Sequence, residues 1–289
     1  MKLVFLHGFT GSPGSLRWVT EALRGARGDE GRHRVGANPL PLENHRGADA
    51  AILEQVSGSG RVQVLAPPLV GHHGGPSAAC RFEEEVERIV RLIDEAKLGQ
   101  VHLLGYSLGG RLALGVALRA PELLCGLSLI GVSPGLDDPR ARAERREADE
   151  GWCRLLAERG LGAFIEAWSA LPLWDTQRGL VAERLTHQRR ERERHTAEGL
   201  VTSLRSVGLG QMPGYSSALE KLRLPVSLMV GALDSKYVAL AERMQRALPR
   251  ASLHVVPRAG HNLLIEAPEQ VAAVLGRQTV YRCRPQISN

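Results

Sequence analysis

Cysteine, lysine and aromatic residues are scarce in this sequence. The four cysteines are widely separated and form no C-x-x-C pair, so we expect neither a disulfide framework nor a zinc site but reduced thiols in a cytoplasmic protein. No apolar run approaches the roughly 20 residues that a membrane-spanning helix requires. The opening "MKLVFLHGF" is interrupted by glycine and histidine, which predicts a buried strand rather than a secretory signal. We therefore expect no association with a membrane.

The charge pattern argues against a nucleic-acid-binding protein. The formal net charge is +6, but only four of the 37 basic residues are lysines, and the arginines are scattered among acidic residues. No block of five like charges is present, whereas a binding groove for nucleic acid would gather its cations on one surface.

Short apolar runs alternate with helical patterns along the chain. This alternation predicts an α/β fold with a mostly parallel sheet flanked by helices. Strands are expected at 2–6, 61–66, 101–105, 126–132, 226–231 and 252–256, and helices at 15–24, 82–97, 108–119, 238–247 and 268–276. In helix 82–97 an apolar stripe should face the core, with the glutamates and arginines on the opposite, solvated face.

Two segments interrupt the alternation. Residues 25–60 show little periodicity and predict an insertion that lies away from the carboxyl ends of the strands. Residues 136–224 read as helical throughout and predict a cap inserted between two sheet strands. The core is then formed by residues 1–135 and 225–276, followed by a tail at 277–289.

A serine stands between glycines at residues 105–109, "GYSLG". The motif G-x-S-x-G between a strand and a helix is typical of a nucleophile elbow, a strained turn that presents Ser107 at the positive end of the helix. Such a serine needs a base, and the base needs an orienting acid. His261 and Asp234 each follow a predicted strand, in the order Ser, Asp, His that this fold class uses. Asp137 and Asp138 are the alternative acids.

Two backbone N–H groups are candidates for an oxyanion hole. One belongs to Leu108, directly after the serine. The other belongs to Phe9 in the loop "LHGFTGS" that follows the first strand. Both should face the position where negative charge develops on a carbonyl or enolate oxygen.

Arg111 follows the serine by four residues, so it lies on nearly the same helix face and close to the interior. An unpaired buried cation costs several kcal/mol, so its guanidinium must meet an internal acid or an anionic ligand. We expect a ligand carboxylate, with the internal ion pair as the alternative.

Several motifs together resemble one family of enzymes. They are "VFLHGFTGS", "LLGYSLGGRLAL", "SPGLDDPRARAERREAD", "AFIEAWSALPLW", "LVTSLRSVGLGQMP" and "PRAGHNLLIEAPEQV". The chain resembles the 2-succinyl-6-hydroxy-2,4-cyclohexadiene-1-carboxylate synthases of menaquinone biosynthesis, which are lyases of α/β-hydrolase fold. The resemblance covers most of residues 1–24 and 61–276. It implies a cofactor-free elimination of pyruvate from 5-enolpyruvoyl-6-hydroxy-2-succinylcyclohex-3-ene-1-carboxylate, with Ser107 acting as the base.

The same resemblance implies which residues bind a small polycarboxylate substrate. They are Arg111, Arg145, Arg192, Tyr106 and Trp168. Three neighbours in "QRRERER" are substitutes for Arg192, namely Arg189, Arg190 and Arg194. For the assembly we expect a monomer or a weak homodimer.

One loop departs from the family pattern. The usual D-x-P-G-H-G is replaced by "APPLVGHHGGPS" at residues 66–77, with proline in place of the acid. His72 and His73 have no third ligand in pattern, so we expect no metal site. Two alternative functions remain open. One is a serine esterase or carbon–carbon bond hydrolase acting on a small carboxylate-bearing substrate, and the other is a binding protein without catalysis on the same scaffold.

Overall fold

A computed structural model describes residues 1–25, 51–57 and 60–282 of the chain. Its strands are β1 (Lys2–Leu6), β2 (Ala51–Ser57), β3 (Gly60–Ala66), β4 (Val101–Tyr106), β5 (Leu124–Ile130), β6 (Val226–Gly231) and β7 (Ala251–Val256). They form one seven-stranded sheet in the order β2-β3-β1-β4-β5-β6-β7. All neighbours are parallel except β2, which runs antiparallel to β3. The predicted mostly parallel α/β sheet is confirmed.

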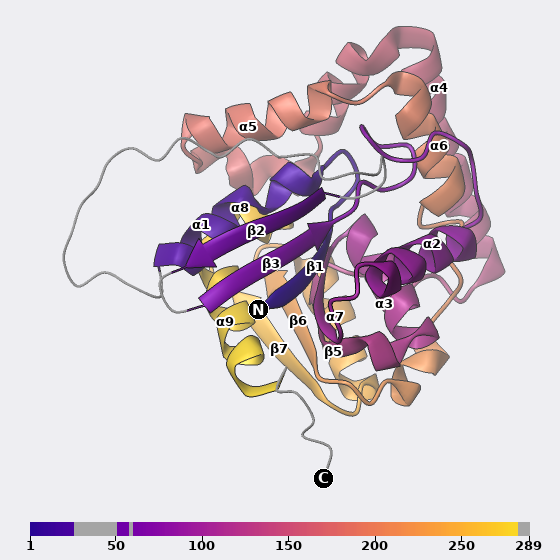
Figure 1. Ribbon diagram of the computed structural model, residues 1–289. Helices are drawn as coiled ribbons and strands as arrows, with labels where there is room; N and C mark the ends of the chain where they lie inside the picture. Colours follow the sequence, from indigo (N-terminus) through magenta and orange to yellow (C-terminus); the bar gives the residue numbers. More distant parts are fainter. Residues whose placement is uncertain (26–50, 58–59, 283–289) are drawn as a thin grey trace.

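Helices cover both faces of this sheet (Figure 1). The helices are α1 (Arg17–Gly25), α2 (Phe82–Glu95), α3 (Leu108–Arg119), α4 (Pro139–Ser169), α5 (Ala182–Glu193), α6 (Ala197–Val207), α7 (Ser235–Ala247), α8 (Leu263–Glu266) and α9 (Pro268–Arg282). Side chains of α2, α3 and α7 share one buried cluster with one face of the sheet, and those of α1, α8 and α9 share a second cluster with the other face. The arrangement is a three-layer α/β/α sandwich.

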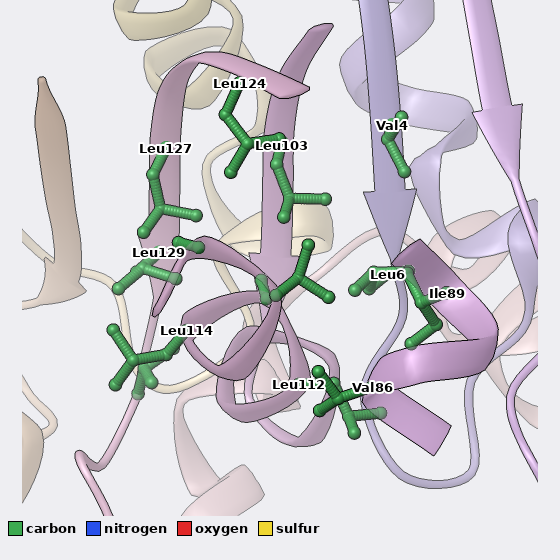
Figure 2. Close-up of a cluster of buried hydrophobic side chains, with 14 of the residues drawn as sticks. Val4, Leu6, Val86, Ile89, Leu103, Leu112, Leu114, Leu124, Leu127 and Leu129 are labelled. Carbon is green, nitrogen blue, oxygen red and sulfur yellow. The ribbon is translucent and has the colours of Figure 1, made fainter. Parts of the chain in front are cut away.

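The first of these clusters fixes the two helices nearest the serine. Leu103, Leu127 and Leu129 of the strands lie beside α3. Val86 and Ile89 of α2 lie beside Leu112 of α3 and Leu6 of β1 in the same cluster (Figure 2). Burying a side chain of this size contributes about 1.5–3 kcal/mol. The start of α3 is thereby held rigidly at the carboxyl end of β4.

A long helical region lies between β5 and β6 and contains α4, α5 and α6. In Figure 1 these helices cover the end of the sheet at which the parallel strands finish. Gly160 has φ 76° and ψ 178°, which breaks α4 into two segments. Both segments pack with α6 in a small apolar cluster that includes Leu156, Phe164 and Leu204.

Three expectations need correction or restriction. Residues 51–57, placed in the insertion and not predicted as a strand, form β2. Ala51 pairs with Ala66 at the carboxyl end of β3, so the expectation that the insertion lies away from the carboxyl ends of the strands is wrong at Ala51. Most of the rest of the insertion and residues 283–289 lie outside the described residues, while 277–282 continue α9. Cys80 and Cys153 are free thiols, but Cys125 is disulfide-bonded, so the prediction of reduced thiols is wrong at Cys125.

Within the described ranges, the helices are all too short or too polar to cross a bilayer.

Candidate active site

Ser107 sits in a strained turn between β4 and α3. Its backbone has φ 50° and ψ −109°, a conformation that non-glycine residues rarely adopt. Glycine is required on both sides of it. A Cβ at Gly105 would lie 2.5 Å from the Gly110 Cα, and one at Gly109 would lie 2.2 Å from the Leu6 carbonyl oxygen. The turn projects the serine hydroxyl from the sheet at the amino end of α3.

Three side chains from separate loops form a hydrogen-bonded series. The Ser107 hydroxyl lies 3.1 Å from His261 Nε2, and His261 Nδ1 lies 2.7 Å from Asp234 Oδ2. Asp234 follows β6, and His261 follows β7. Their side chains are almost completely buried, so the carboxylate and the ring hold one orientation. The geometry is that of a base held by an acid and facing a hydroxyl.

The alternative acids lie elsewhere. Asp138 accepts hydrogen bonds from the backbone N–H groups of Arg140 and Ala141 and so caps α4. Asp137 packs against Gly214. Neither hydrogen-bonds the ring of His261, which leaves Asp234 as its partner.

The two candidate oxyanion donors flank Ser107. Leu108 is the first residue of α3, where a helical N–H has no acceptor within its own helix. Phe9 follows Gly8, and a Cβ built on Gly8 would lie 3.6 Å from Ser107 Cβ. The Phe9 peptide therefore passes directly beside the serine.

Arg111 is buried behind the serine without an acid. Its Nη1 donates to the Val207 carbonyl at 3.1 Å, and no carboxylate of the described residues pairs with it. Burial lowers its pKa to about 10, and repulsion from Arg145 acts in the same direction. Since this pKa still lies far above neutral pH, the structure places a permanent cation one helical turn after the candidate nucleophile.

Arg145 has a partner of its own. Its Nε and Nη2 atoms each lie 2.9 Å from Asp149 Oδ1, one turn further along α4. The arginine side chain is 36% exposed, whereas that of Asp149 is 7% exposed. The structure therefore brings Arg145 into the electrostatic neighbourhood of Arg111 but pairs it with a carboxylate.

Among the arginines of α5 and the residue after it, Arg192 is the buried one. Arg189, Arg190 and Arg194 are exposed. Arg192 donates from Nη1 to Ser169 Oγ at 2.6 Å, while its Nε has no hydrogen-bond partner among the residues that the structure describes. Burial lowers its pKa to about 10. Like Arg111, it forms no ion pair with a carboxylate in the portion that the structure covers.

Two predicted aromatic residues occupy different surroundings. The ring of Tyr106 lies 5.6 Å from that of His261, centroid to centroid, and burial raises the pKa of its phenol. Trp168 stacks on Phe164 at 5.6 Å and contacts Phe9 at 5.3 Å. Trp168 therefore belongs to the cap core and touches the candidate oxyanion loop from that side.

The sequence reasoning missed two aromatic residues that touch the histidine. The ring centroid of Tyr237 lies 4.5 Å from that of His261, and that of Trp174 lies 6.0 Å away. The Arg192 guanidinium lies 5.4 Å from the Trp174 ring. Both residues could have been found in the sequence, because Tyr237 is one helical turn beyond Asp234 and Trp174 ends the motif "AFIEAWSALPLW".

Two hollows are lined by residues that neighbour the triad, although Ser107, His261 and Asp234 line neither of them. One is lined by Phe9, Tyr106, Trp174, Arg192 and Asn262, among others. The other has a volume of about 650 Å³, and Ser133, Leu136, Leu209 and Tyr237 are among its lining residues. Over the described ranges, no three histidine, cysteine, aspartate or glutamate side chains converge as a metal-ligand set.

The sheet order, the helical region after β5 and the serine turn are together those of an α/β-hydrolase, and a model of the alpha/beta hydrolase family matches residues 3–274. The chain is 31% identical over 231 residues to 2-succinyl-6-hydroxy-2,4-cyclohexadiene-1-carboxylate synthase of Salmonella paratyphi C, covering 78% of this chain and 85% of the relative. A Bacillus subtilis protein provisionally given the same name is 30% identical over 266 residues, covering 92% and 85%. The chain belongs to this family of synthases.

A solved structure shares the fold. MenH from S. aureus superimposes with a TM-score of 0.80 at 24% identity, covering 97% of this chain and 93% of that one. The two relatives at 30% and 31% identity confirm the resemblance to the synthase family inferred from the sequence motifs.

Proposed function

We propose that the protein is a carbon–oxygen lyase of menaquinone biosynthesis. It would eliminate pyruvate from 5-enolpyruvoyl-6-hydroxy-2-succinylcyclohex-3-ene-1-carboxylate and release 2-succinyl-6-hydroxy-2,4-cyclohexadiene-1-carboxylate. The observation that carries this proposal is the pair of buried guanidiniums of Arg111 and Arg192, which have no carboxylate partner among the described residues, together with the hydrogen-bonded Ser107, His261 and Asp234. A substrate with several carboxylates supplies the missing anions.

The triad is proposed to move a proton. His261 Nε2 accepts the hydroxyl proton of Ser107 while Asp234 stabilises the resulting imidazolium through Nδ1–H. The serine oxygen takes a proton from the substrate ring. The electron pair of that C–H bond moves into the adjacent carbonyl as an enolate. When it returns it forms the C2=C3 double bond, the ring C3=C4 pair shifts to C4=C5, and the C–O bond to the enolpyruvyl group breaks. The enolpyruvate takes up the proton held by the His261 imidazolium and leaves as pyruvate, so the sequence is redox-neutral, requires no electron carrier and returns the triad to its starting state.

The Phe9 and Leu108 N–H groups would hold the enolate oxygen that forms as the ring proton leaves. A single donor of this kind contributes about 10²- to 10³-fold to kcat. The helix that begins at Leu108 adds its positive end. Proton removal at the ring carbon and charge stabilisation at the enolate oxygen then act on one conjugated group of the substrate.

Substrate orientation is proposed to come from the arginines. Arg111 and Arg192 each offer a desolvated guanidinium, which prefers the planar, two-oxygen geometry of a carboxylate. Arg145 would contribute through the edge of its guanidinium that Asp149 leaves unoccupied. Tyr106 and Trp168 would close the apolar walls. A cytoplasmic monomer or weak homodimer remains our prediction for the protein's setting.

The direct test is to supply the purified protein with the enolpyruvyl substrate and follow pyruvate by a coupled assay. We expect pyruvate and the cyclohexadiene product in equal amounts, and loss of both in Ser107→Ala with the fold retained. Rapid turnover of p-nitrophenyl esters without pyruvate would instead indicate a serine esterase. Full biological activity of Ser107→Ala would indicate a binding protein.

A further inference from the structure

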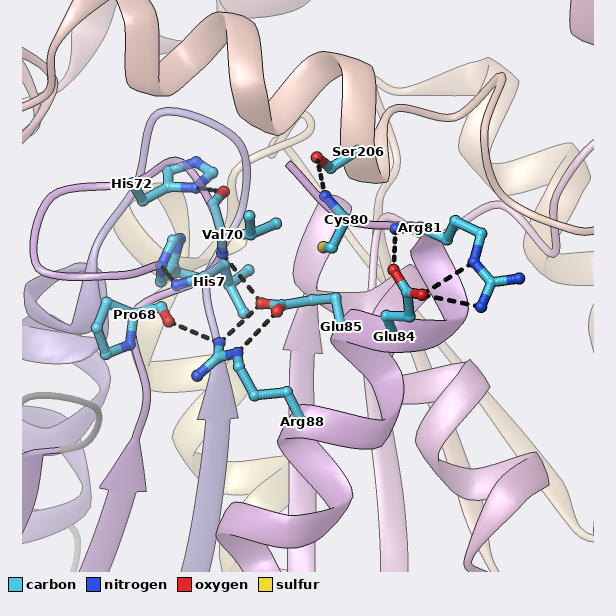
Figure 3. A network of polar contacts seen from close by, with 11 residues as sticks. His7, Pro68, Val70, His72, Cys80, Arg81, Glu84, Glu85, Arg88 and Ser206 are labelled. Carbon is cyan, nitrogen blue, oxygen red and sulfur yellow. Dashed lines mark hydrogen bonds and ion pairs between the residues drawn. The ribbon is translucent and has the colours of Figure 1, made fainter. Parts of the chain in front are cut away.

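A buried carboxylate enters the loop that lacks the family's acid. Glu85 of α2 is 1% exposed at its side chain, although the helix pattern predicts a solvated face. Its Oε1 accepts the Val70 N–H at 3.0 Å. Arg88 binds both carboxylate oxygens at 2.7 Å and also donates to the Pro68 carbonyl at 2.9 Å. Figure 3 shows this clamp around the loop.

The clamped loop holds His7. The residue between Pro68 and Val70 is Leu69, whose N–H donates to His7 Nε2 at 3.3 Å. Burial lowers the pKa of His7 to about 3, so the ring is neutral and carries one N–H. Because Nε2 accepts a hydrogen bond, the hydrogen must be on Nδ1. The loop thus selects the tautomer of this ring.

That tautomer fixes the peptide between Gly8 and Phe9. His7 Nδ1 donates to the Gly8 carbonyl at 2.9 Å, and the Gly11 N–H donates to the same oxygen at 3.0 Å. The peptide is trans, so its N–H points away from its carbonyl. With the carbonyl directed at His7, the Phe9 N–H is directed away from it. A rotated peptide would remove this donor and turn an oxygen toward the site.

We propose that Glu85, with Arg88, is a positioning residue that keeps the Phe9 N–H in its catalytic orientation through Leu69 and His7. The inference rests on the proposed function, since the N–H matters only if an oxyanion forms there. The carboxylate reaches the loop from α2 instead of from the loop's own sequence, where proline stands. Glu85 and Arg88 therefore anchor the loop at Pro68 and Val70, although the loop's own sequence has proline where the family has an acid.

The test compares Glu85→Gln with Glu84→Gln. Glu84 is the neighbouring residue, pairs with Arg81 at the surface and serves as the matched control (Figure 3). In the pyruvate assay, Glu85→Gln should lower kcat by about 10- to 100-fold with KM little changed. This loss is no larger than the loss expected from removing a whole oxyanion donor. Glu84→Gln should leave both constants unchanged. Equal kcat in folded Glu85→Gln and wild type would overturn the proposal, whereas a wild type that releases no pyruvate would instead overturn the proposed function.

A second measurement needs no activity. Two-bond ¹H–¹⁵N spectra of ¹⁵N-histidine protein, assigned with His7→Gln, report which ring nitrogen carries hydrogen. We expect the Nδ1–H form of His7 in the wild type and a loss of that single form in Glu85→Gln. An Nε2–H form in the wild type would contradict the relay, even if the Glu85 variant did not fold.

Discussion

Replacing Arg111 with methionine should make the protein less active and more stable. The arginine is 9% exposed and its described hydrogen-bond partner is one carbonyl, that of Val207. Removing a buried cation that lacks an acid relieves a penalty of several kcal/mol. The Val207 carbonyl then loses its donor, which costs about 1–3 kcal/mol. The net expectation is a rise of about 1 kcal/mol in the free energy of unfolding.

The effect on catalysis should have the opposite sign. A hydrogen bond to a charged group contributes about 1.5–3 kcal/mol, which corresponds to about a 10- to 150-fold loss of kcat/KM. Pyruvate release measures kcat/KM, and urea unfolding measures the free energy of unfolding. Arg119→Met is the matched control, because Arg119 lies on the same helix but pairs with Glu87 at the surface. An unchanged kcat/KM in Arg111→Met, or a marked loss of stability, would refute the reasoning.

Two further predictions concern other buried groups. Arg192→Gln should lower kcat/KM about tenfold or more by the same hydrogen-bond argument, whereas exposed Arg190→Gln should not; equal losses in the two variants would contradict the assignment. Burial lowers the pKa of His102 from 6.5 to about 4, so the unfolded chain binds the extra proton between these pH values and stability falls as pH falls. Its share is about 1.4 kcal/mol of unfolding free energy per pH unit. When the free energy of unfolding is measured with urea between pH 6 and pH 4, it should fall less steeply with falling pH in His102→Gln than in the wild type. An equal pH dependence in the two proteins would show that His102 is not buried in its neutral form.

The parallel core could be predicted because each strand is a short apolar run of its own. The antiparallel strand β2 could not, because an edge strand obtains its stability from pairing with its neighbour. Its segment "AILEQVS" follows a region without periodicity, and its pairing with β3 is set by tertiary structure.

Glu85 illustrates a signal that was visible and misread. At about 100° per residue, Glu85 lies only about 40° from Ile89 around the helix, so the periodicity itself places it beside the apolar stripe. The prediction that Glu85 is solvated considered only its charge. The partners that make its burial tolerable, Val70 and Arg88, are known only once the loop is folded against α2.

The triad of Ser107, Asp234 and His261 could be predicted from the order of motifs along the chain, because each of these residues follows a strand of the same sheet. Contacts between the cap and the core did not follow in this way. Trp174 reaches His261 from a segment between α4 and α5, and nothing in the local pattern specifies how the cap lies over the sheet. Arg145 differs, because its partner Asp149 lies one turn further along the same helix and the spacing alone could have predicted the pair.

The central claim is that Ser107, activated by His261, removes a ring proton and forms no bond to carbon. The most direct measurement is the single-turnover rate of pyruvate release from substrate that carries deuterium at the ring carbon losing its proton. The account predicts slower release than from the protiated substrate. Equal rates, accompanied by a mass increase on Ser107 in the quenched enzyme, would contradict it.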